Sequence, residues 1–321
     1  MKAMMKRALC LTLALSLMLT LLCGLPAASA ETKPQPISKV DYDSLPEPGN
    51  GQHHYLLLCQ DTWADHSTLG HTDGIVLVTL DTRTKRVMFT SIIREALVER
   101  PDGVIGRIND IARRFSPEDL CKVISTHLGV KVEKYIIFNF SHIQSIIDFL
   151  GGVDITINSS EANYLTRYAI SKTSTSPSVR GAGTYHFYGH AAVIYMRIRK
   201  AGGGGDFTRT QRVRTVLSTL TDQCREMDYD KARELVDIVL DNSSRTNMSL
   251  EDMVAAMEYC LDLRDCTIEE LRIPQEGDHH GITYAGMSVH EVDWEASREK
   301  MANFLENSFL VVDDEEEDEE E

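Results

Sequence analysis

The fold is decided by the stretch YLLLCQDTWADHSTLGHTDGIVLVTL, residues 55–80. It contains two apolar runs, Tyr55–Leu58 and Gly74–Leu80, whose length and composition are typical of buried strands. The first run leads into Asp61, and Asp73 lies directly before the second run. The stretch therefore predicts two strands that each carry a carboxylate at the point where strand and loop meet.

Strands and helices alternate after this stretch. A turn at Asp81–Lys85 separates the second strand from a third at Arg86–Ile93, which predicts a hairpin. The later predicted elements are a helix at Glu118–Leu128 that stops at Gly129, a strand at Lys134–Asn139, a helix at Ser141–Leu150, a strand at Val153–Ile157, a segment at His190–Arg199 that begins as a helix, and a helix at Thr208–Met227. This alternation indicates an α/β fold, with a three-layer αβα domain over residues 52–225. Helices at Tyr229–Leu240 and Ser249–Leu263 make residues 226–312 a small, mainly helical C-terminal extension.

The two ends of the chain differ from the body. Residues 1–30 have the order of a secretory signal peptide: a positively charged start, an apolar run and a small-x-small site at Ala28-Ser29-Ala30. The apolar run is also long enough to act as an N-terminal membrane anchor if it is not removed. Residues 31–51 are rich in Pro and polar residues, which predicts a linker, and residues 313–321 are all acidic, which predicts a disordered tail. We therefore expect an exported protein.

Composition and charge exclude several classes of function. The chain has 321 residues with 33 Lys and Arg against 49 Asp and Glu, a formal net charge of −16. Nucleic-acid binding needs a basic footprint and is not expected. The cysteines share no zinc-ligand spacing, so a thiol metal site is not expected either. Cys59 and Cys121 lie in apolar contexts and are interpreted as core residues, whereas Cys260 and Cys266 are close enough in sequence for a local disulfide.

One segment reverses the acidic balance of the body. Residues 197–214 hold Arg197, Arg199, Lys200, Arg209, Arg212 and Arg214 against a single acid, Asp206. Four successive glycines, Gly202–Gly205, lie inside this segment, where exposed backbone N–H groups can approach a ligand closely. Arginine side chains beside such a loop suit bidentate binding of phosphate. The alternative is a solvated helix face, but acids are nearly absent, so an anion site is favoured.

Asp61 and Asp73 are candidate ligands of one Mg²⁺, because this ion prefers a few carboxylate oxygens together with phosphates. The alternative is that both aspartates are turn residues or caps. Arg94 follows the third strand and is a candidate for the same sheet edge, or else the partner in a surface ion pair. These residues, together with the basic segment, indicate one site only if the fold brings them to one place.

A series of short motifs then follows in order: LLLCQD at 56–61 with GHTDGIVLV at 70–78, SIIRE at 91–95, RIN at 107–109, FLGGV at 149–153, GHAA at 189–192 with YMRIR at 195–199, and DFTR at 206–209. In this order, over about residues 54–220, they resemble the LytR-CpsA-Psr domain. The resemblance implies a three-layer αβα domain with a central mixed β-sheet. It also implies a membrane-associated, Mg²⁺-dependent phosphotransferase of Gram-positive-type cell walls, acting at the outer face of the cytoplasmic membrane or in the wall. Members move a glycopolymer, of teichoic acid or capsular polysaccharide type, from a polyprenyl-pyrophosphate carrier to peptidoglycan.

The resemblance also implies roles for individual residues. Those that correspond to the Mg²⁺-associated aspartates are Asp61 and Asp73, those that correspond to pyrophosphate-binding arginines are Arg94, Arg107, Arg197, Arg199 and Arg209, and those expected at the catalytic centre are Arg94 and Asp206. The base for the acceptor hydroxyl is either Asp73 or Asp206. The prenyl chain is expected in the apolar interior between sheet and helices.

Some motif positions depart from the family pattern, and they keep two alternatives open. Cys59 stands where a glycine is usual, Ile93 where a proline is usual, Glu95 where an aspartate is usual, and Val213 where many members have a glutamine. His71 stands where an arginine is usual, and the other charged residues of the motifs are retained in charge. One alternative is a non-catalytic module that binds polyprenyl phosphates or wall polymer, and the other is a lipid pyrophosphatase.

Overall fold

The structure is a computed structural model that describes residues 34–49, 51–167, 178–198 and 205–306. The chain divides into two compact units. Of the first, the described residues are Pro34 and Thr283–Met287, and the second contains Gln35–Ile282 and the chain from Ser288 onward. All contacts discussed below lie within the second unit. The expected signal peptide, residues 202–204 of the four-glycine segment and the acidic tail fall outside the described residues.

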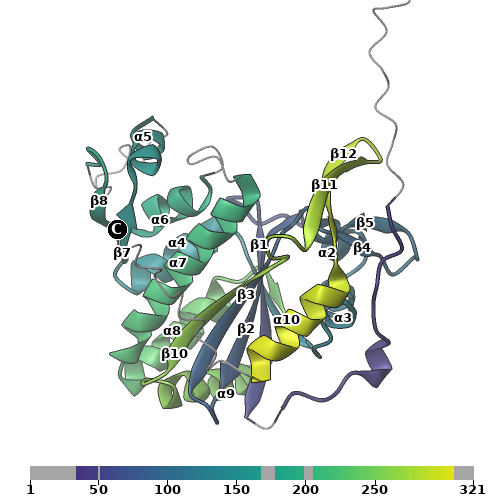
Figure 1. Cartoon of the computed structure of the whole chain (residues 1–321). Helices are drawn as coiled ribbons and strands as arrows, with labels where there is room; N and C mark the ends of the chain where they lie inside the picture. The colour runs from purple at the N-terminus through teal and green to yellow at the C-terminus, as the bar shows by residue number, and fades with distance from the viewer. Residues whose placement is uncertain (1–33, 50, 168–177, 199–204, 307–321) are drawn as a thin grey trace, which may run out of the picture. The chain divides into compact units, whose positions relative to one another are not determined.

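A six-stranded sheet lies at the centre of the second unit (Figure 1). Its strand order is β10 (Thr267–Ile273), β3 (Arg86–Ile92), β2 (Thr72–Asp81), β1 (Gln52–Gln60), β6 (Lys134–Phe138) and β9 (Arg245–Thr246). β1 pairs with β6, and β10 with β3, in parallel, whereas the other neighbours are antiparallel. The predicted mixed sheet and the predicted hairpin of β2 and β3 are therefore confirmed.

Helices cover both faces of this sheet. Successive side chains along β1 point to opposite faces and are apolar on both, so both faces need a covering layer. Leu56 and Leu58 are fully buried in a cluster that includes residues of α3 (Pro117–Leu128) and α10 (Trp294–Glu306). Leu57 points to the other face, which is covered by α4 (Phe140–Phe149), α7 (Gly205–Arg225), α8 (Tyr229–Asp241) and α9 (Leu250–Asp262). Figure 1 shows α4, α7 and α8 on one side of the sheet and α3 and α10 on the other. The three-layer αβα prediction is confirmed.

Local signals place the helix ends where they were expected. The side chain of Ser116 caps α3 by accepting a hydrogen bond from the backbone N–H of Asp119 at 3.0 Å, and Pro117 occupies the first turn. The helix ends at Gly129, whose φ of 72° is the left-handed conformation that glycine adopts at little cost. Asn139 caps α4 in the same way through the N–H of His142 at 2.9 Å. The backbone N–H of Phe140, the first residue of α4, donates to the carbonyl oxygen of Thr62 at 2.9 Å, which places the start of α4 beside the loop that follows β1.

Shorter elements surround the layers. They are η1 (Tyr42–Ser44), β4 (Leu97–Glu99), β5 (Ile105–Arg107), η2 (Ile108–Asp110), α2 (Ile111–Arg114), β7 (Val153–Ile157), α5 (Ser159–Arg167), β8 (Gly183–Phe187), α6 (Gly189–Met196), β11 (His279–Tyr284) and β12 (Met287–Val292). The predicted strand at residues 153–157 exists, but it pairs with β8 in a separate two-stranded sheet rather than joining the central one. Its residues alternate between buried and exposed, which is the pattern of a strand with one face in water.

The expected boundary at residue 225 does not separate two folding units. Helices α8 and α9 confirm the two helices expected there, but β9 and β10 return to the central sheet as its edge strands. β10 pairs with β3 along seven residues. Its sequence, TIEELRI, carries three charged residues among apolar ones, as edge strands often do. Residues beyond 225 thus complete the sheet as well as adding helices.

Two further findings concern the cysteines and the membrane. Cys260 and Cys266 are free thiols, so the structure does not contain the local disulfide that their spacing allowed. Within the described ranges, each helix is too short or too polar to cross a membrane.

A buried ion pair anchors α10 to the sheet. Arg86, which is 1% exposed, donates from Nη2 to Asp81 Oδ2 at 3.3 Å and to the carbonyl oxygen of Leu305 at 2.8 Å. Its Nη1 donates to the carbonyl oxygen of Phe304 at 3.2 Å. A cation at the C-terminal end of a helix also complements the helix dipole.

We predict that Arg86→Ala lowers the free energy of unfolding by about 3–5 kcal/mol, because it leaves the buried carboxylate of Asp81 without its cation. Urea denaturation followed by circular dichroism measures this change. The control is Arg83→Ala on the neighbouring exposed turn, which should change stability by less than about 0.5 kcal/mol. Equal effects of the two substitutions would contradict the assignment.

Candidate active site

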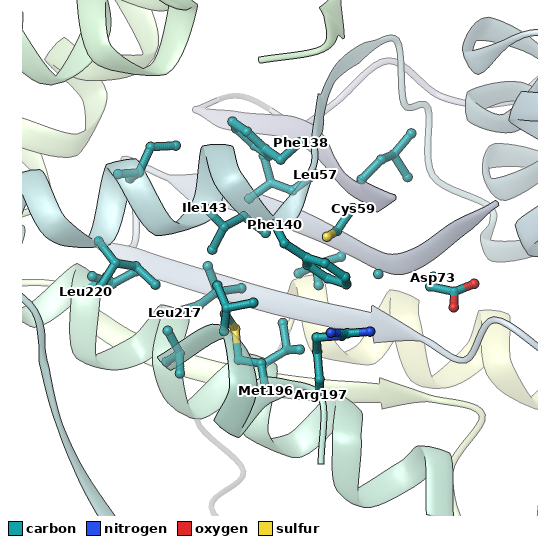
Figure 2. A pocket seen from close by; sticks show the side chains of 18 of the residues that line it. Leu57, Cys59, Asp73, Phe138, Phe140, Ile143, Met196, Arg197, Leu217 and Leu220 are labelled. Atoms are coloured by element: carbon teal, nitrogen blue, oxygen red, sulfur yellow. The ribbon is translucent and has the colours of Figure 1, made fainter. Parts of the chain in front are cut away.

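An apolar cavity of about 350 Å³ lies between the sheet and the helices α4, α6 and α7. Most of its lining is aliphatic or aromatic, and its polar side chains are Asp61, Asp73, Arg197 and Arg209. Figure 2 shows Leu217 and Leu220 on one side of this space and Asp73 on the other, with Arg197 close to Met196 along the lower edge of the view. The cavity thus combines a long apolar surface with a charged end.

A second apolar cavity of about 350 Å³ continues beneath α7, α8 and α9. Both cavities share the lining residues Leu57, Ile136, Ile146, Leu217, Leu220 and Val239. The second is lined by further aliphatic residues and by the sulfur-containing side chains of Cys224, Cys260, Cys266, Met227, Met248, Met253 and Met257. Methionine is flexible and adapts to irregular apolar ligands. The apolar space expected between sheet and helices is therefore present and extends far from the charged end.

Asp73 is the centre of the charged end. Arg94 Nη1 forms an ion pair with Asp73 Oδ2, and Asn109 Nδ2 donates to Oδ1 at 3.0 Å. Arg209, which is 7% exposed, donates from Nη2 to the backbone carbonyl of Asp73 at 3.1 Å. Arg94 also donates from Nε to Glu95 Oε1 at 2.5 Å. Three segments that are distant in sequence thus meet at the first residues of β2.

Asp61 and Arg197 form the other half of the charged end. Asp61 directly follows β1, and Arg197 directly follows α6. Arg197 Nη2 donates to Asp61 Oδ1 at 3.0 Å. The guanidinium lies over the face of Phe140, 4.3 Å from the ring centroid, which is the geometry of a cation–π contact. Figure 2 shows this ring and guanidinium together beside the cavity.

The basic segment of residues 197–214 is divided between two roles. Arg197 and Arg209 line the cavity, whereas Arg212 and Arg214 are buried in other contacts. Arg212 Nε donates to Glu161 Oε1 and its Nη1 donates to the carbonyl oxygen of Ile198, both at 2.7 Å. Arg214 Nε donates to a carboxylate oxygen of Glu270 at 3.0 Å. Arg212 therefore holds the backbone that follows Arg197, and neither Arg212 nor Arg214 is among the residues that line the cavity.

The remaining predicted residues lie elsewhere or outside the description. Arg107 does not line the cavity, and its Nη2 donates to the carbonyl oxygen of Ser288 at 2.7 Å. Its neighbour Asn109 reaches Asp73 instead, and sequence reasoning missed that role although Asn109 is part of the RIN motif. Arg199 lies outside the described residues. Asp206 belongs to the first turn of α7, but the position of its side chain is not among those described.

Cys59 and Gly74 face each other across β1 and β2 at the cavity wall. A Cβ atom at Gly74 would lie 2.9 Å from Cys59 Cβ, so the cysteine leaves room only for glycine opposite. Cys59 packs against a core cluster, as expected, and also lines the cavity. Cys121 is buried, as expected. Burial, and then the nearby carboxylates of Asp61 and Asp73, raise the pKa of the Cys59 thiol to about 12.

The sequence matches the LytR_cpsA_psr family over residues 26–302. The chain belongs to this family. The matched region extends past the boundary expected at residue 225, in agreement with the return of β10 to the sheet. The central mixed sheet between helices is thus the fold of a LytR-CpsA-Psr domain.

Two curated relatives are identical to this chain at about one residue in four of the matched region. The polyisoprenyl-teichoic acid–peptidoglycan teichoic acid transferase TagV of Bacillus subtilis (strain 168) is 25% identical over 176 residues, which are 52% of this chain and 42% of TagV. TagT of the same organism, a transferase of the same name, is 25% identical over 231 residues, or 71% of this chain and 69% of TagT. The match to TagV thus spans less than half of that relative.

Solved structures show the same fold. A structure of TagT bound to LI-WTA superposes with a TM-score of 0.62 at 22% identity, covering 88% of this chain and 99% of that one. The crystal structure of B. subtilis TagV has the same TM-score at 20% identity and covers 80% and 98% of the two chains.

The raised pKa of Cys59 has a consequence for stability. An unfolded thiol ionises near its ordinary pKa of 9.0, whereas the folded one stays neutral to about 12. Above pH 9 the thiol therefore ionises in the unfolded chain but not in the folded one. The contribution of Cys59 to the free energy of unfolding is complete below pH 9 and is lost as the pH rises from 9 toward 12.

We predict that the stability advantage of the wild type over Cys59→Ala decreases by about 1.4 kcal/mol between pH 8 and pH 10. Urea denaturation of both proteins at several pH values measures it, and the difference between the two cancels the titration of the other cysteines. A difference that does not change with pH would contradict the burial of this thiol.

Proposed function

We propose that this protein is an extracytoplasmic phosphotransferase that moves a glycopolymer from a polyprenyl-pyrophosphate carrier to peptidoglycan. One observation carries the proposal: a long apolar cavity ends at two aspartates and two arginines. A ligand that fits both parts has a long apolar chain and a doubly charged anionic head. The names of the curated relatives, which are teichoic acid transferases, agree with this class of substrate.

The arginines suit a pyrophosphate head group. Breaking the bond between two phosphates needs cations that stabilise the charge developing on the phosphate oxygens. Arg197 and Arg209 line the cavity, and Arg94 approaches it through its ion pair with Asp73. Planar guanidinium groups bind phosphate through paired hydrogen bonds. On binding, phosphate oxygens would compete with Asp61 and Asp73 for these donors.

The proposed reaction needs no nucleophile from the protein. A hydroxyl oxygen of the peptidoglycan glycan forms a bond to the phosphorus that carries the glycopolymer. The bond between that phosphorus and the bridging oxygen breaks, and polyprenyl phosphate leaves with the electron pair. The hydroxyl proton passes to a carboxylate, for which Asp73 and Asp206 are the candidates. The products are a phosphodiester on peptidoglycan and the lipid monophosphate.

Asp61 and Asp73 are the residues that would hold Mg²⁺. Both carboxylates line the same charged end, and their oxygens are the hard donors that this ion prefers. Across the described ranges, no group of three or more His, Cys, Asp or Glu side chains is arranged to bind a metal, so phosphate and water would supply the other ligands. A bound Mg²⁺ would neutralise charge on the phosphates.

We predict that Arg197→Ala weakens the binding of farnesyl pyrophosphate by at least tenfold, about 1.4 kcal/mol, while the affinity for uncharged farnesol stays unchanged. Isothermal titration calorimetry with the full chain measures both affinities. Arg233→Ala, which removes the same charge from the exposed face of α8, is the matched control and should bind like the wild type. Equal losses for farnesyl pyrophosphate and farnesol would show that the head group does not lie at Arg197.

Turnover separates transfer from the two alternatives. With a sugar-bearing prenyl pyrophosphate and a soluble peptidoglycan fragment, the proposal expects release of prenyl phosphate together with a sugar phosphodiester on the fragment. Release of prenyl phosphate without that product would indicate a lipid pyrophosphatase. Tight binding with no release would indicate a binding module.

Mg²⁺ should strengthen farnesyl pyrophosphate binding to the wild type and not to Asp61→Asn. This comparison of affinities tests the metal site without a measurement of activity.

A further inference from the structure

Trp63 exposes a large aromatic ring next to the candidate active site. Its residue is 36% exposed, whereas Trp294, the other tryptophan of the chain, is 2% exposed. The exposed part of Trp63 forgoes the stabilisation that burial of apolar surface brings. Trp63 lies two residues after Asp61, in the loop between β1 and β2. An exposed ring at this point therefore needs an explanation.

The backbone on both sides of this ring is tied to the start of α4. The carbonyl oxygen of Thr62 accepts from the N–H of Phe140 at 2.9 Å, and that of Trp63 accepts from Ser141 Oγ at 2.5 Å. The capped N-terminus of α4 thus holds the loop in one place.

Two other rings hold the indole. The ring of Phe140 meets it edge-on, with centroids 5.4 Å apart, and the imidazole of His190 stacks on it at 5.3 Å with planes inclined by 29°. Aromatic pairs at such separations stabilise one another. The indole is therefore ordered before any ligand arrives, which lowers the entropy cost of stacking a further ring on it.

Phe140 connects this ring to the charged end of the cavity. One face of Phe140 carries the guanidinium of Arg197, which in turn binds Asp61. Trp63 is therefore a single aromatic ring away from the proposed phosphate site. A sugar attached to a phosphate at Arg197, or a sugar whose hydroxyl attacks that phosphate, would lie next to Trp63, outside the apolar cavity.

We propose that Trp63, supported by His190, is a sugar-stacking subsite beside the phosphate site. The chemistry fits, because one face of a pyranose ring consists of C–H groups and packs on an indole while its hydroxyls stay in water. The sugar is either the first residue of the donor glycopolymer or the acceptor residue of peptidoglycan, which share this chemistry. The inference rests on the proposed function, since it takes the phosphate to lie at Arg197.

Other exposed apolar residues lack this placement. Among the described residues, the large exposed ones besides Trp63 are Val104, Tyr188, Tyr229 and Leu250. None of these four lines either cavity, and none is in ring contact with a cavity residue. A purely structural role for Trp63 would be to cover the edge of Phe140, and substitutions distinguish this from sugar binding.

The experiment uses tryptophan fluorescence of the full chain, because Trp294 is buried and only Trp63 is open to iodide quenching. Three probes are compared: geranyl pyrophosphate, geranyl pyrophosphate bearing one N-acetylhexosamine, and a soluble peptidoglycan disaccharide. The sugar-bearing lipid should protect Trp63 from iodide if the sugar belongs to the donor, and the disaccharide should do so if it belongs to the acceptor. Sugar-free geranyl pyrophosphate should bind without this protection.

Binding by the variants completes the test. Trp63→Ala should lower the affinity for whichever sugar ligand protects Trp63 roughly tenfold and leave the affinity for geranyl pyrophosphate unchanged. Trp63→Phe should recover most of the lost affinity. Tyr229→Ala, which removes an exposed ring from α8, is the matched control. Equal effects of Trp63→Ala on the sugar-bearing and sugar-free lipids would show a structural role only and overturn the inference.

Failure of this inference is distinguishable from failure of the proposed function. If geranyl pyrophosphate binds and depends on Arg197, but no sugar ligand protects Trp63, the subsite is wrong and the proposed function stands. If none of the three probes binds to a folded protein, both are wrong.

Discussion

The charged end of the cavity depends on Asp73, because elements that are far apart in the chain meet at this one residue. Its carboxylate binds Arg94, which follows β3, and Asn109, which belongs to η2, while its backbone carbonyl accepts from Arg209 on α7. A carboxylate that is mostly withdrawn from water needs such partners to offset its desolvation. The same contacts align the arginines toward one space. A single electrostatic constraint therefore both stabilises this corner of the fold and prepares an anion site.

The apolar part of the site has a different physical origin. Side chains such as Leu57 alternate with core residues along β1 and point to the face covered by α4, α7, α8 and α9. On the opposite face, α3 and α10 pack tightly against Leu56 and Leu58. One face of the sheet thus packs against a buried core cluster, while the other borders two adjoining apolar cavities. An apolar space of this kind binds a lipid chain without needing specific polar contacts.

Much of this architecture could be predicted from local patterns. The apolar runs of β1 and β2, the helical spacing of α3 and its stop at Gly129 are properties of short segments, so sequence alone located them. The motifs also indicated the family. The partners of β7 and β10 could not be predicted, because pairing depends on which edges are free after the rest of the sheet has formed.

The same distinction applies to the site. Sequence alone determined that Asp61 and Asp73 each lie where a strand meets a loop, and that residues 197–214 form a basic segment. Only the tertiary structure decided that Arg197 and Arg209 face the cavity while Arg212 is buried against Glu161, and that Asn109 rather than Arg107 contacts Asp73. The reason is that an arginine's charge is a property of the residue, whereas its partner is set by which carboxylate the packing of helices and strands brings within hydrogen-bonding distance.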